Sequence, residues 1–239
     1  MNESINKSMN RKRLVKIGGV SGIVLGVVQL GGIVMHGSIP VDLAEGLVFV
    51  ENHPAWALTH ILLITSYLVI ISFYVGFRAS FDEKLDLPAL EIGANLTLVG
   101  AILGAVHFII HFALYPFFSA KYQALQGTVE GENVLTFYMS VHHYAHLLNR
   151  CSLFLLMIVA CIFALSMLRV TYYKRWLGIL GTASSLVTIV AVAISEIFLP
   201  RSTGDIVFAV ALLPTIVWIV AVGVSMLKLR FPQQLTEGG

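Results

Sequence analysis

The sequence predicts an all-α integral membrane protein, a single bundle of six membrane-spanning helices. Hydrophobic residues make up 57% of the 239 residues and charged residues only 12%, against about a quarter in an average soluble domain. Apolar runs long enough to cross a bilayer recur six times, separated by short polar segments. A chain of this length leaves no room for a separate soluble domain beside six spans.

The spans are placed by hydrophobic length, flanking charge and helix-breaking residues. A polar, basic tail at residues 1–13 precedes the first span, and Pro88 suits the first turn of the third. Pro116 is expected to mark the exit of the third span, followed by a polar loop over 119–133. A short helix is expected within 41–50. The predicted spans lie at about 14–36, 55–77, 90–117, 134–169, 176–199 and 205–227, in a membrane domain over 14–228 followed by a tail at 229–239.

Lysine and arginine are concentrated in alternate polar segments. Lys121 and Arg201 are the only loop cations on one side of the predicted membrane. The positive-inside rule then places both termini in the cytoplasm and the chain in the cell's cytoplasmic membrane. All eight histidines fall in the outer half or in outer loops. The net charge of +2, with no basic patch among aromatic residues, gives no sign of a nucleic-acid partner.

Histidines gather where the fourth span begins. His142, His143 and His146 share a helical arc of about 120° with Asn149 and Arg150. His142 and His146 have the i,i+4 spacing that presents two imidazoles to one ion.

The third span repeats this spacing with His107 and His111. Because the predicted orientation brings both pairs to the outer half, we expect them to converge on one site. Either His60 or His36 could complete the ligand set. The predicted metal ligands are His60, His107, His111, His142 and His146.

Other polar residues at the same level have open interpretations. Glu196 is the candidate catalytic base, and Asp205 could serve beside it as ligand or base. Arg150 either binds an anionic group, such as a lipid phosphate or a haem propionate, or pairs with Glu196. His53 and His143 are expected to be bystanders.

The metal hypothesis has two chemical forms. In one, the histidines hold a bare zinc, iron or copper ion with an open position facing the outer surface, for hydrolytic or redox chemistry. In the other they are axial ligands of a b-type haem, and Gly100 and Gly104 leave room for the porphyrin. Expected partners are the lipid bilayer and a small-molecule or lipid ligand at the outer face. The sequence leaves open whether the protein is an enzyme.

The alternative is a ligand-binding, pH-sensing or transport protein whose histidines are polar lining. Stripes of small residues on the first, third and fifth spans could then serve a transport path.

The segments His107-Phe-Ile-Ile-His111 and His142-His143-Tyr-Ala-His146 resemble the histidine boxes of membrane di-iron hydroxylases and desaturases. The order of the boxes differs, and the sites of that family face the cytoplasm, so this resemblance carries no activity over. The layout is also similar to small six-span bacterial membrane proteins of unknown function, most of all over residues 173–180. That family lends no functional residues.

Overall fold

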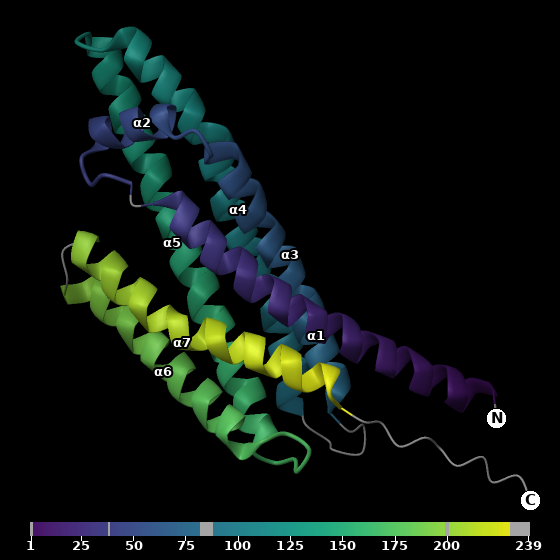
Figure 1. The fold of residues 1–239 in the computed structure, drawn as a ribbon. Coiled ribbons are helices and arrows are strands. Elements are labelled where there is room, and N and C mark those ends of the chain that lie inside the picture. The colour runs from purple at the N-terminus through teal and green to yellow at the C-terminus, as the bar shows by residue number, and fades with distance from the viewer. Residues whose placement is uncertain (1, 38, 82–87, 199–200, 230–239) are drawn as a thin grey trace, which may run out of the picture.

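The computed structural model describes the chain except for residues 1, 38, 82–87, 199–200 and 230–239. The side chains of 2–8, 196, 201–202 and 205 also lie outside the described part. Among the described residues every element is an α-helix, and six are long and apolar enough to cross a membrane, which confirms the predicted bundle (Figure 1). The helices are α1 (Asn2–His36), α2 (Leu43–Asn52), α3 (Trp56–Ser80), α4 (Pro88–Leu125), α5 (Val129–Met167), α6 (Arg175–Phe198) and α7 (Arg201–Leu227).

The helices α4 and α5 are longer than predicted. The polar loop expected over 119–133 is wrong, because α4 continues through Pro116 and only a short turn separates it from α5. A proline in a long helix can bend it without ending it. The reversal comes at Gly127, with φ of +80°, and Thr128 caps α5 by accepting the Gly131 N–H at 3.1 Å.

This hairpin extends beyond the membrane thickness. With 38 and 39 residues, α4 and α5 are each nearly twice as long as the roughly 30 Å hydrocarbon core. The short helix expected between the first two spans is present as α2, capped by Asp42, which accepts the Glu45 N–H at 2.9 Å. It packs across the hairpin, where the Ser119 hydroxyl donates to the Leu47 carbonyl at 2.6 Å.

Small residues bring the helices into close contact. The helix α1 packs against α3 and α7, and α5 packs against α4 and α6. A Cβ atom added to Gly18 would lie 2.7 Å from the Cα of Gly76, and one added to Gly93 would lie 2.9 Å from the Phe163 ring. The stripes suggested for a transport path are therefore packing faces between helices.

A dense aromatic core fills the half of the bundle far from α2. We call it the packed end, defined by Phe73, Phe77, Phe163, Tyr173 and Trp218, all buried. The Tyr173 hydroxyl donates to Ser80 Oγ at 2.6 Å, and burial raises the pKa of Tyr173 above its ordinary value.

Candidate metal centre

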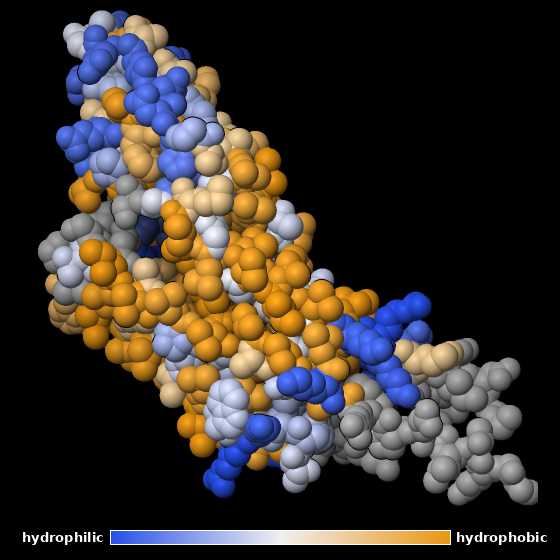
Figure 2. Space-filling view, viewed as in Figure 1, coloured by the Kyte–Doolittle hydropathy of each residue, from blue (hydrophilic) through white to orange (hydrophobic). Residues whose placement is uncertain are grey.

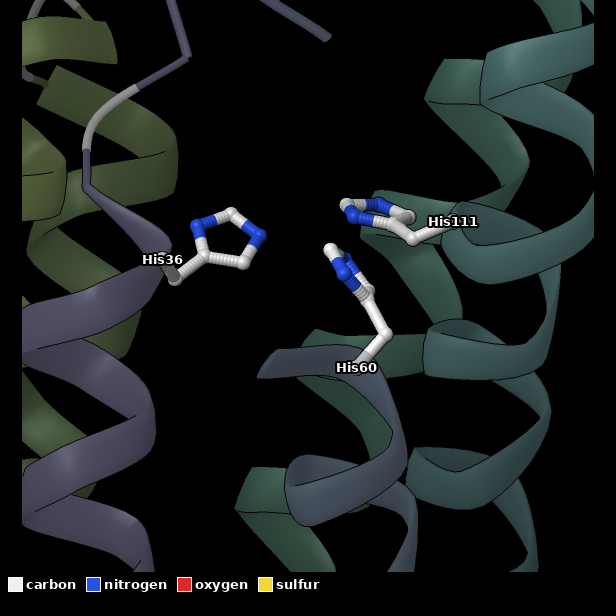
Figure 3. Close-up of side chains that lie close together, drawn as sticks. All are labelled: His36, His60 and His111. Carbon is white, nitrogen blue, oxygen red and sulfur yellow. The ribbon is translucent and has the colours of Figure 1, made fainter. Parts of the chain in front are cut away.

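Three histidines from three helices meet at the opposite half of the bundle (Figure 3). His36 is the last residue of α1, His60 lies near the start of α3 and His111 lies within α4. Their ring centroids are 5.1 Å (His36–His60), 5.7 Å (His60–His111) and 6.0 Å (His36–His111) apart. One ring nitrogen of each lies within 4.8 Å of the others. This spacing lets a single ion contact all three after small side-chain rotations.

Hydrogen bonds set the tautomer of two of these rings. The Nδ1 atom of His60 lies 2.7 Å from the Trp56 carbonyl, and that of His36 lies 2.9 Å from the Gly37 carbonyl. Because a carbonyl can only accept, Nδ1 carries the proton in both rings and Nε2 keeps the lone pair. Metal-bound histidines commonly have this outer hydrogen bond to a carbonyl.

Each of the three rings also has a buried nitrogen without a hydrogen-bond partner among the described residues. These atoms are His36 Nε2, His60 Nε2 and His111 Nδ1. A buried polar atom left in this state costs free energy, about 1–3 kcal/mol. An ion at the centre of the triad would bond one ring nitrogen from each histidine.

The indole of Trp56 contacts the triad histidines His60 and His111. Its ring centroid lies 4.1 Å from that of His60, and its plane is within 7° of the His111 ring at 6.4 Å. Its Nε1–H donates to the His111 backbone carbonyl at 3.2 Å. Trp56 thereby fixes the start of α3 against α4 at the depth of the site.

A helix-ending glycine and a hydrogen bond from His53 fix the end of α1. Gly37 has φ of +64°, the left-handed conformation that commonly ends a helix, and this stops α1 directly after His36. His53, in the segment between α2 and α3, donates from Nε2 to the Met35 carbonyl at 2.9 Å. His53, the expected bystander, therefore holds the end of α1 next to His36 and is not one of the three triad residues.

A cavity of about 340 Å³ adjoins the triad. His36 and His111 form part of its wall, and α5 contributes four polar residues. Figure 2 shows a hollow on this side of the bundle, with hydrophilic residues inside it. The polar residues from α5 are His142, His146, Asn149 and Arg150.

The remaining predicted ligands line this cavity rather than join the triad. His107 Nδ1 donates to the Ala145 carbonyl at 2.8 Å, and its ring centroid lies 4.2 Å from that of His111. His142 Nδ1 lies 2.6 Å from the Tyr115 hydroxyl. His146 Nε2 accepts a hydrogen bond from Arg150 Nε at 3.2 Å.

The structure thus divides the five predicted metal ligands into two groups. His60 and His111 belong to the triad, whereas His107, His142 and His146 surround the space in front of it. The third member of the triad is His36, which the sequence indicated only as an alternative to His60. Spacing along the chain shows that His36 ends a span, but not that this end turns toward α3 and α4. His143 is exposed.

Arg150 is buried in the cavity wall. Its guanidinium carbon lies 5.0 Å from the centroid of the Phe208 ring, a cation–π contact. The side chains of Glu196 and Asp205 lie outside the described residues. The Arg150–Glu196 pair and the role of Glu196 as a base therefore stay predictions.

The room expected for a porphyrin is not there. A Cβ atom added to Gly104 would clash with the Tyr67 ring and lie 2.7 Å from Ser152 Oγ. One added to Gly100 would lie 3.0 Å from Leu156. Close helix packing fills the space beside both glycines, so the expectation of room for a porphyrin there is wrong, while haem binding itself stays a prediction.

Comparison of the chain with protein-family models, with curated proteins and with solved structures finds no match. Function must therefore be inferred from the residues of the triad and the cavity.

Proposed function

We propose that this protein is a membrane metalloprotein in which His36, His60 and His111 hold one transition-metal ion. The observation that carries the proposal is the convergence of three histidines from three helices, with one ring nitrogen of each within 4.8 Å of the others. Each of the three rings also has a buried nitrogen without a hydrogen-bond partner among the described residues. Neutral imidazole is a good ligand for zinc, copper and iron. The excess of Lys and Arg in alternate loops supports a site at the outer face of the cytoplasmic membrane.

The donor set favours zinc. Non-haem iron oxygenases typically add a carboxylate to two histidines, and blue-copper sites add a cysteine. Among the described residues, the group close enough to share an ion contains three histidines and neither of these. Cys151 is exposed and Cys161 is half-buried, and neither belongs to the group.

The cavity gives the ion an open position. Catalytic zinc sites have three protein ligands and leave the fourth for water or substrate. Zinc there would lower the pKa of a bound water and polarise a substrate oxygen. We therefore propose a metal-dependent hydrolytic enzyme, with His107, His142 and His146 available around the reacting group to donate or accept protons.

Metal analysis of the purified protein tests the proposal. We expect about one ion per chain in the wild type, and loss of that ion in His60→Ala and His111→Ala with the folded yield retained. The matched control is His143→Ala, which removes an exposed histidine and should leave the metal content unchanged. Acidification should release the ion, because the three imidazoles must be neutral to bind it.

Two results would contradict the proposal. One is a wild-type protein without stoichiometric metal, which would leave the cavity as a ligand-binding or pH-sensing site. The other is full metal retention in both ligand variants.

A further inference from the structure

The cavity beside the triad is lined by two chemically different sets of side chains. The imidazole, amide and guanidinium groups of α1, α4 and α5 make up the first set, which we call the polar wall, and apolar side chains from α1, the segment after it, α3, α4 and α7 make up the second set, the apolar wall. The apolar residues are Ile33, Ile39, Leu63, Phe108, Phe208 and Ala209.

The polar wall favours an anion once the ion is bound. Three neutral imidazoles leave the double positive charge of a zinc ion uncompensated. Arg150 adds a cation to the wall, where its Nε donates to His146 Nε2 and its guanidinium carbon lies 5.0 Å from the centroid of the Phe208 ring. Anionic oxygens are the natural partners of both groups.

The position of the cavity favours a ligand from the bilayer. It lies between the α1–α7 pair and α5, with Ile33 and Phe208 on the lining inside two membrane-spanning segments. The hollow in Figure 2 is at the side of the bundle, with hydrophobic surface below it. A molecule arriving from the lipid would meet the apolar wall and the polar wall together.

We infer that the cavity binds the phosphate group of an anionic membrane lipid, with a phosphate oxygen directed to the metal and the first part of the acyl region against Ile33 and Phe208. This rests on the proposed function, because the ion supplies most of the positive charge. It names the substrate class of that site as a phosphate-bearing amphiphile.

A cobalt-loaded sample separates the possible sources of the phosphate. Cobalt(II) can replace zinc, and its visible spectrum changes when a ligand enters the coordination sphere. We would titrate the detergent-solubilised protein with inorganic phosphate and with a short-chain phosphatidic acid. We expect both to change the spectrum, with the lipid binding at least about tenfold more tightly because its methylene groups become buried.

Two substitutions address the two walls. Ala209→Trp should fill the apolar part and weaken the lipid about tenfold or more while leaving inorganic phosphate unchanged. The control Val217→Trp lies on the same helix at an exposed position and should change neither. Arg150→Gln should weaken both ligands about tenfold, with the spectrum before ligand addition showing that the cobalt site is intact.

The outcomes are distinguishable. Equal affinity for phosphate and lipid, or an effect of Ala209→Trp on both, would overturn a lipid source. Retained cobalt whose spectrum responds to neither ligand would overturn the inference and leave the metal centre standing. Failure to retain cobalt would overturn the metal centre as well.

Discussion

The two ends of the bundle bury polar groups in opposite ways. At the packed end, the Arg11 guanidinium donates to the carbonyls of Ala79 and Phe81, both at 2.9 Å, where α3 ends. Tyr173 and Ser80 bond each other. The exception is the indole N–H of Trp218, which has no partner among the described residues.

The histidine end is defined by His36, His60 and His111 with the adjoining cavity, and each of these three rings has a buried nitrogen without a hydrogen-bond partner among the described residues. Burying polar atoms without partners is costly, and here the cost is concentrated at one point beside open space. The comparison teaches that buried polar groups at the packed end mostly bond within the protein, whereas the histidine end has a packed cluster of its own but leaves buried ring nitrogens without partners among the described residues. Local exceptions to good packing of this kind are typical of functional sites.

The largest expected effect is a loss of stability when the helix packing at the packed end is disrupted. Gly18→Ala would place a methyl group 2.7 Å from the Gly76 backbone and should lower the free energy of unfolding by about 3 kcal/mol. Gly31→Ala on the same helix meets nothing within 4 Å and is the control, expected to be neutral or slightly stabilising. Denaturant titration in detergent measures both; equal stability of the two variants would refute the packing argument.

The next largest effect concerns the support of the triad at the histidine end. Trp56→Phe removes the N–H that bonds the His111 carbonyl and should weaken metal binding about tenfold, as is usual for groups that orient a ligand. A competition titration with a chelator measures it. Trp176→Phe, at an exposed position, should bind metal like the wild type. If the two variants behave alike, Trp56 does not support the site.

A smaller effect concerns the cavity wall. Tyr115→Phe removes the hydroxyl bonded to His142 but keeps the ring that stacks on His111, with centroids 4.1 Å apart. We expect a loss of about 1 kcal/mol in stability and unchanged metal content. Thermal unfolding and metal analysis, with the exposed Tyr144→Phe as control, check this. Loss of the ion would mean that His142 is itself a ligand.

The smallest effect lies on the surface. Arg78 and Glu91 form an ion pair between α3 and α4, in which Glu91 is exposed and Arg78 is half-buried. Glu91→Gln should therefore cost about 0.3 kcal/mol, and the difference should vanish in high salt. If Glu91→Gln lowered stability more than Tyr115→Phe does, the surface ion pair would contribute more to stability than the buried hydrogen bond.

The sequence predicted the six spans because hydrophobic length is a strong signal in a membrane protein. It failed at Pro116, where a helix-breaking residue lies inside a helix held by its neighbours. It also predicted that His60 and His111 would share a site, because charge asymmetry set their depth.

The membership of His36 could not be predicted in the same way. Its ring reaches the triad because α1 packs on α3 through Gly18 and Gly76, and because Gly37 ends α1 directly behind it. Depth along a span says nothing about rotation around it. Likewise, spacing alone could not show that His107 and His146 already have hydrogen-bond partners.

X-ray absorption at the zinc edge tests the central claim most directly, by comparing the zinc-loaded wild type with His36→Ala. We expect three imidazole nitrogens at about 2.0–2.1 Å in the wild type and two in the variant. An unchanged spectrum in His36→Ala would contradict the account, because the ion would then be held by other histidines of the cavity.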